Sequence, residues 1–160
     1  MHPLLYTLQD HDLGHFKVIA EFWGLDLPPE PSLLAAEWLS AVMLDEELVL
    51  EIAESLPKTA RKALDDLLQR GGRAPYADMT RRYGLIRDMG AGRRDRTKPW
   101  RNPISPLEVL WYRGLVARAF ADTSAGAQEF IFIPSDLLQR LPAPISKVDF
   151  IPGVKAPDPK

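Results

Sequence analysis

The chain has 160 residues, of which 46% are hydrophobic, and its formal net charge is −2 at pH 7. This length suits one domain or two small ones with a substantial core. The absence of cysteine excludes a disulfide framework, thiolate catalysis and a zinc finger. No apolar run approaches the ~18 residues that a membrane span needs, and the N-terminus lacks a signal-peptide pattern. We therefore expect a cytoplasmic protein without a membrane partner.

The small net charge conceals a strong asymmetry along the chain. Residues 1–56 carry eleven acidic side chains and one basic one, residues 57–101 carry thirteen basic and five acidic ones, and residues 102–160 carry six of each. The chain is thus acidic at its start and basic in its middle. Together with the pattern of turns, this division predicts an acidic helical unit at 1–56, a second domain at 57–141 and a proline-rich, extended or disordered tail at 142–160.

Three helices are predicted in the acidic unit. Asp12 is a suitable N-cap for the first, which should end near Gly24. A proline-rich linker at 25–31 leads to a second helix after Ser32, and Asp45 should cap a third that ends before Pro57. The side chains expected to face inward are Phe16, Ile19, Ala20 and Trp23, then Leu34, Trp38 and Val42, then Leu48, Ile52 and Leu56.

Two further helices are predicted at the start of the second domain. Pro57 suits a helix start, and Gly71-Gly72 suits its end. Residues 73–74 are expected to be extended, and Pro75 should begin a helix that ends before Gly84. The inward-facing residues should be Ala60, Ala63, Leu64, Leu67 and Leu68, then Tyr76, Met79 and Tyr83. Residues 85–104, which contain glycines, prolines and arginines, are expected to be irregular.

The strongest helix signal follows at residues 105–108. Ser105-Pro106-Leu107-Glu108 has the pattern of a capping box with proline at the first helical position. Strands are predicted at 115–120 and 129–133 around a turn at 123–126, and a short helix at 134–141. Three helices followed by a hairpin are typical of a winged helix. The expected fold class is therefore mainly α, an α+β winged-helix-like fold.

Four short stretches also resemble a known family. They are Asp12-Leu13-Gly14, Ile19-Ala20-Glu21-Phe22-Trp23-Gly24, Leu110-Trp111-Tyr112-Arg113-Gly114-Leu115 and Phe132-Ile133-Pro134-Ser135-Asp136-Leu137. In these stretches the chain resembles bacterial winged-helix proteins related to the N-terminal region of XPB-type helicases, over roughly residues 10–142. The resemblance implies a DNA-associated or helicase-associated role by analogy.

The segment 81–101 is the main candidate for binding. It holds eight basic and two acidic side chains, with Gly90 and Gly92 nearby and Trp100 available to stack on a base. We interpret it as a flexible loop that contacts phosphates; two other interpretations are pairing with the acidic unit or a partner, and simple solvation. The predicted nucleic-acid-binding residues are Arg81, Arg82, Arg87, Arg93, Arg94, Arg96, Lys98, Trp100, Arg101, Arg113 and Arg118.

The helix at 106–113 occupies the position of a recognition helix. Its outward face should carry Glu108, Val109, Tyr112 and Arg113, and only Arg113 suits contacts with base edges. Trp111 should be buried on the opposite side, as Trp23 and Trp38 should be on their helices. Arg118 could touch phosphate from the hairpin, whose turn has no basic residue. We therefore predict little sequence specificity.

No catalytic or cofactor motif is present. Asp10, His11, Asp12 and His15 are the one cluster of metal-ligand types, but Asp12 is needed as a cap and spacing fixes no third ligand. We therefore expect exposed histidines and no metal. Gly90-Ala91-Gly92-Arg93 is too short for a phosphate-binding loop, and there is no nucleophile elbow. The chain is predicted to be non-enzymatic and without cofactors.

These observations favour a helicase-associated module that binds DNA, or less favourably RNA, through phosphates. The main alternative is a protein–protein adaptor whose basic loop docks an acidic partner, such as a helicase or DNA-processing subunit. A third interpretation is a dimeric transcription regulator.

Overall fold

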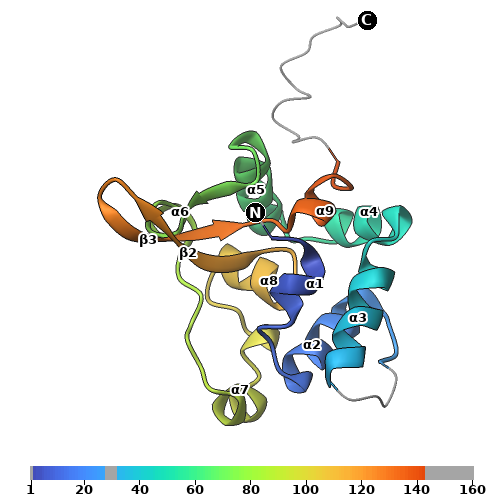
Figure 1. Cartoon of the computed structure of the whole chain (residues 1–160). Coiled ribbons are helices and arrows are strands. Elements are labelled where there is room, and N and C mark those ends of the chain that lie inside the picture. Colours follow the sequence, from blue (N-terminus) through green and yellow to red (C-terminus); the bar gives the residue numbers. More distant parts are fainter. Residues whose placement is uncertain (1, 28–31, 143–160) are drawn as a thin grey trace, which may run out of the picture.

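The computed structural model describes residues 2–27 and 32–142 (Figure 1). These residues form a mainly helical structure with one small three-stranded antiparallel sheet, which confirms the mainly-α, α+β part of the fold prediction. Residues 28–31 of the expected linker lie outside the described residues. The expected tail does so as well, from residue 143 onward.

The acidic half contains four helices: α1 (Leu4–Leu8), α2 (Leu13–Trp23), α3 (Ser32–Met43) and α4 (Glu46–Glu54). The Asp12 carboxylate accepts a hydrogen bond from the backbone N–H of His15, and Gly24 ends α2 in the left-handed conformation at φ 69°. The Asp45 carboxylate accepts from the first turn of α4. The predicted caps are therefore confirmed, because each depends only on neighbouring residues.

The predicted inner face of α3 is wrong. Leu34 is 48% exposed, whereas Ala35, Ala36, Leu39 and Met43 are buried. The helix reads Ser-Leu-Leu-Ala-Ala-Glu-Trp-Leu-Ser-Ala-Val-Met, so apolar residues surround most of its circumference. Apolar spacing does not select one face in such a helix, and packing against α1 and α2 decides the matter.

The second half contains the sheet. Its elements are α5 (Lys58–Gln69), β1 (Arg73–Pro75), α6 (Tyr76–Tyr83), α7 (Ala91–Thr97), the 3-10 helix η1 (Pro99–Arg101), α8 (Pro106–Tyr112), β2 (Ala117–Thr123), β3 (Gly126–Phe132) and α9 (Ser135–Leu138). The strand order is β1-β3-β2. Ala74 on β1 lies opposite Ile131 on β3, which lies opposite Arg118 on β2. The predicted hairpin is confirmed, with both strands reaching closer to the turn than expected.

The segment 85–104 was expected to be irregular throughout. This expectation is wrong in part, because the segment contains α7 and η1. The sequence of α7, Ala-Gly-Arg-Arg-Asp-Arg-Thr, has no apolar stripe from which a helix could be predicted. Lys98 ends it in the left-handed conformation at φ 51°. The helix is held by contacts with residues far away in the sequence, described below.

The predicted outward face of α8 is also wrong. Glu108 is 0% exposed, and Val109 and Tyr112 are buried as well. The Ser105 hydroxyl accepts from the N–H of Glu108 at 3.0 Å, as predicted. The Glu108 carboxylate, however, accepts from the N–H groups of Ile104 and Arg87 and from the Arg87 side chain. Contacts with α2, α5, α6 and η1 surround α8, so it is a central structural helix.

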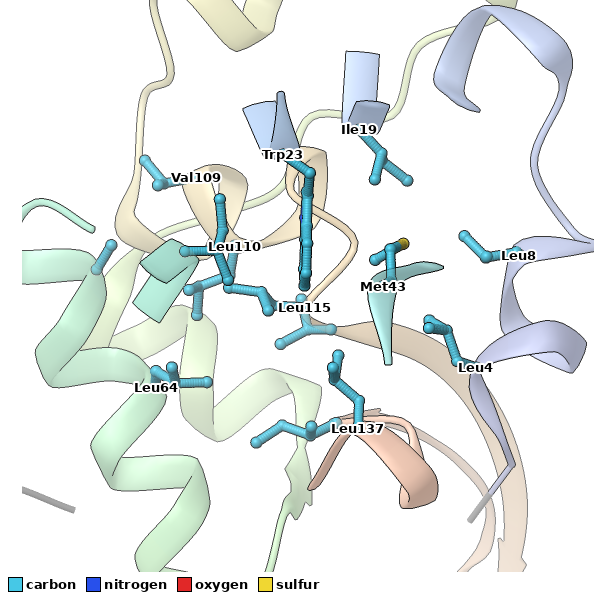
Figure 2. Packing of buried hydrophobic residues seen from close by; sticks show 14 of the residues in the cluster. Leu4, Leu8, Ile19, Trp23, Met43, Leu64, Val109, Leu110, Leu115 and Leu137 are labelled. Atoms are coloured by element: carbon cyan, nitrogen blue, oxygen red, sulfur yellow. The ribbon is translucent and has the colours of Figure 1, made fainter. Parts of the chain in front are cut away.

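Side chains from both predicted units form one hydrophobic core (Figure 2). Leu4, Ile19 and Met43 from the acidic half belong to the same cluster as Leu64 and Leu110 from the second half. The Trp23 indole N–H also donates to the backbone oxygen of Arg113 at 2.7 Å. The other two tryptophans predicted to be core residues, Trp38 and Trp111, are half-buried and pack against this cluster. The predicted boundary near residue 56 therefore marks a change from acidic to basic sequence, while the hydrophobic core is continuous across it.

Candidate nucleic-acid interface

The helices α7 and η1 carry a group of exposed basic side chains. Arg93, Arg96, Lys98 and Arg101 are all exposed, and no ion pair is found for any of them among residues 2–27 and 32–142. We refer to these four residues as the basic ridge. Figure 1 places α7 at the lower edge of the molecule, on the same side as α2 and away from the β2–β3 hairpin.

Arg94, in contrast, is buried and holds α7 against α2. The residue is 6% exposed, and its guanidinium donates to both carboxylate oxygens of Asp12, at 2.6 and 2.9 Å. It also donates to Asp95 at 2.9 Å. The hydrogen bond from Arg94 lowers the pKa of Asp12 to about 2, and Asp12 in turn raises the pKa of Arg94. Asp12 thus caps α2 and anchors α7 at the same time.

Gly14 makes room for this ion pair. A Cβ atom at position 14 would collide with the terminal nitrogen Nη2 of Arg94. Glycine therefore lets the guanidinium lie directly against the first turn of α2. The close approach explains how a side chain from residue 94 reaches the N-cap of a helix that begins 81 positions earlier.

A polar cavity of about 300 Å³ is lined by residues 10–12 and the start of α2, by residues 86–89, by Ala91 and Arg94 of α7, by the end of α8 and by Arg118 of β2. His11 stacks on His15 with ring centroids 3.9 Å apart, and His15 also stacks on Tyr112. The expectation of exposed histidines is wrong: His15 is 4% exposed, and its Nε2 has no hydrogen-bond partner among the described residues. Burial lowers the pKa of His11 to about 4 and that of His15 well below its usual value.

The arginines that line this cavity all contact carboxylates. Arg87 contacts Glu108 at 2.7 Å, and Arg118 contacts Glu129 at 2.9 Å and Asp88 at 3.2 Å. Burial by itself raises the pKa of Glu108, but the hydrogen bonds from Arg87 and from two backbone N–H groups together lower it. These guanidiniums are engaged within the fold, which leaves them less available to phosphate.

The other predicted site residues lie apart from the ridge or are partly covered. Arg81 and Arg82 lie on α6, where Arg81 pairs with Asp78 of the same helix and Arg82 lies 4.0 Å from Asp66 of α5. Arg113 lies over the Phe22 ring at 4.1 Å. Trp100 is half-buried, with its ring centroid 6.1 Å from that of Tyr112. The structure thus brings the four ridge residues together on neighbouring elements, while the remaining predicted cations have other environments.

Sequence reasoning missed α7 and the cluster of stacked rings. The sequence does contain a usable signal for α7, because Gly90 stands at the start of the helix and Pro99 comes directly after Lys98, the residue that ends it. No local signal marks the rings, because His11 and Tyr112 are brought together only by packing. In the described part of the chain, no group of three or more histidines and carboxylates is arranged to hold a metal ion.

Comparison of the chain with family models, curated proteins and solved structures gave no match. Among residues 2–27 and 32–142, no helix combines the length and apolar character that crossing a bilayer requires.

Proposed function

We propose that this protein is a non-enzymatic module that binds nucleic acid through the phosphate backbone, with DNA as the preferred partner and with little sequence specificity. The basic ridge carries this proposal. Four exposed cations lie within nine residues of chain, on and just after the helix α7 that the Asp12–Arg94 ion pair holds in place, and none of them has a carboxylate partner among the described residues. Cations fixed in this way bind phosphates without first breaking internal pairs.

The order of elements supports a winged-helix assignment for the second half. The chain runs from helix α5 through strand β1 to helices α6 and α8 and then to the β2–β3 hairpin. Strand β1 pairs with β3, the second strand of the hairpin. Helix α7 is then an insertion between the second and third helices of the motif. A helicase-associated role agrees with this assignment and with the resemblance described above.

The proposed lack of specificity follows from the position of α8. A winged helix that reads bases inserts its third helix into the major groove. Here that helix is buried on nearly all sides, and the hairpin turn at 123–128 carries no cation. Contacts from the ridge would fall on phosphates, which carry no direct sequence information.

Salt titrations test this proposal. The triple variant Arg93→Ala, Arg96→Ala, Lys98→Ala should flatten the slope of log affinity against log salt on duplex DNA by roughly 2.7, or about 0.9 per lost phosphate contact. Parallel titrations with single-stranded DNA and RNA rank the partners. A control variant, Lys17→Ala, Lys58→Ala, Lys62→Ala, removes the same charge from exposed positions elsewhere. No binding at low salt, or an equal loss in the control, would refute the proposal.

One observation favours the adaptor as a second candidate. Leu85 and Ile104 are 58% and 57% exposed, and a hydrogen bond of 2.6 Å from the Ser105 hydroxyl to the Leu85 oxygen joins their segments. Exposed apolar side chains near a basic surface suit an acidic amphipathic peptide. If the protein is an adaptor, the double variant Leu85→Ser, Ile104→Ser should abolish binding of a peptide made of glutamate and leucine. The triple variant Arg93→Ala, Arg96→Ala, Lys98→Ala should only weaken this binding. Retention of peptide binding by the Leu85/Ile104 variant would argue against this candidate.

A further inference from the structure

A second surface lies where α2 and α4 end side by side. It is a hollow of about 590 Å³, and four of its lining side chains are apolar: Phe22 and Leu48 are half-buried, and Trp23 and Ile52 are buried. We refer to these four side chains as its apolar floor. The exposed side chains of Glu51 and Glu54 stand at its rim. We refer to this hollow as the acidic groove. It lies in the acidic half of the chain, and none of its lining residues belongs to the basic ridge.

The helix ends make the groove more negative than its two carboxylates alone would. The C-terminal residues of both α2 and α4 line it, and neither helix has a basic residue in its last turn. A helix C-terminus carries a partial negative charge, so Glu51 and Glu54 stand at the unfavourable end of their own helix. Neither carboxylate has an ion-pair partner in the part of the chain that the structure describes.

Arg61 and Arg113 lie near these helix ends and donate hydrogen bonds within the fold. Arg61 donates to the backbone oxygen of Ala53 at 3.3 Å and to Asp65 at 3.2 Å. Arg113 donates to the Val109 oxygen and stacks over Phe22. Neither lines the groove. Neither cation pairs with Glu51 or Glu54 in the described fold, so a bound cation would offset the cost of placing these carboxylates at a helix C-terminus.

We propose that the acidic groove binds a basic segment of a partner protein. Lysine or arginine side chains of that segment meet Glu51 and Glu54, and an apolar side chain between them packs against Phe22 and Leu48. The two negative helix ends and the carboxylates select for positive charge, whereas the apolar floor selects a peptide over a bare metal ion. Nucleic acid is repelled from this surface. The inference therefore adds a protein-binding face to the proposed nucleic-acid-binding one, and the two faces are independent of each other.

The experiment uses the full chain and a fluorescent 12-residue peptide in which lysines flank leucines. Binding is measured by anisotropy and mapped by amide chemical shifts. The variant Glu51→Gln, Glu54→Gln should weaken binding roughly tenfold, an effect within the range expected for the loss of two surface ion pairs. The matched control Glu46→Gln, Glu47→Gln removes the same charge from the exposed first turn of α4, outside the groove, and should retain most of the affinity. The same peptide with alanine in place of leucine should bind more weakly.

Shift changes confined to residues 22–24 and 48–55 support the proposal. An equal loss of affinity in both double variants would overturn it, because attraction to the acidic half as a whole would then suffice. Unchanged affinity after Glu51→Gln, Glu54→Gln would overturn it too. Two further results would overturn the proposal. If Mg²⁺ or spermidine bound as tightly as the peptide, the apolar floor would have no role. If the protein self-associated and the Glu51→Gln, Glu54→Gln variant did not, the occupant would be a second copy of the chain. Each readout is independent of DNA binding, so failure here leaves the basic ridge untested.

Discussion

Helices α7 and α8 have the same length of seven residues but opposite roles. Helix α8 has a side-chain cap and apolar residues, and its only acidic residue is buried against Arg87. Helix α7 has no side-chain cap, and of its three arginines only Arg94 is buried. The sequence predicts a helix with an exposed face for α8 and no helix for α7. The comparison teaches that a single long-range ion pair can decide which side chain of a helix is buried, and can hold in place a helix that has no apolar stripe.

The largest effect is expected at Glu108. The variant Glu108→Ala should lower the free energy of unfolding by about 3–5 kcal/mol, because it leaves the Arg87 guanidinium and two backbone N–H groups without their acceptor. Urea denaturation measures this change. Glu37→Ala, which truncates an exposed glutamate in the middle of α3, is the control and should stay within about 0.5 kcal/mol of the parent. A small effect at Glu108 would mean that α8 tolerates exposure and would remove the contrast between the two helices.

The stacked histidines should make stability fall on mild acidification. The pKa of His11 is lowered from 6.5 to about 4 in the folded protein, so its contribution is fully present above pH 6.5 and is lost as pH falls toward 4. His15 shifts in the same direction. We expect a loss on the order of 2–3 kcal/mol across this range, measured by urea denaturation.

The double variant His11→Phe, His15→Phe keeps two aromatic rings without these titrating groups, and its stability should vary less between pH 6.5 and 4. The pKa of Asp12 is about 2, so the Asp12–Arg94 ion pair stays charged throughout this interval. An identical pH dependence in the two proteins would show that other groups cause it.

A smaller effect is expected where α7 meets α2. Arg94→Ala should destabilise the fold by about 1–2 kcal/mol, since Asp12 is half-exposed and retains its role as the cap of α2. Its neighbour Arg93 is exposed, so Arg93→Ala should change stability by less than about 0.5 kcal/mol. Hydrogen exchange of the amides in 91–97 should accelerate only in the Arg94 variant. Equal exchange in both variants would show that the ion pair does not hold α7.

Much of the local structure could be predicted from the sequence. The N-caps at Asp12, Asp45 and Ser105, the helix ends at Gly24 and Gly84 and the β2–β3 hairpin depend on residues close together in the chain. Such signals act through backbone hydrogen bonds and backbone conformation, which neighbouring residues control. The charge asymmetry also indicates the basic segment that contains the basic ridge.

Other features were decided only by the tertiary structure. Arg94 meets Asp12 across 82 positions, and Arg87 meets Glu108 across 21. These contacts divide a run of arginines that looks uniform in the sequence into buried ion pairs and exposed cations. Packing likewise selected the inner face of α3 and buried His15 beside Tyr112. The physical reason is that burial depends on which distant groups arrive at the same place, and a charged side chain enters the interior only where an opposite charge meets it.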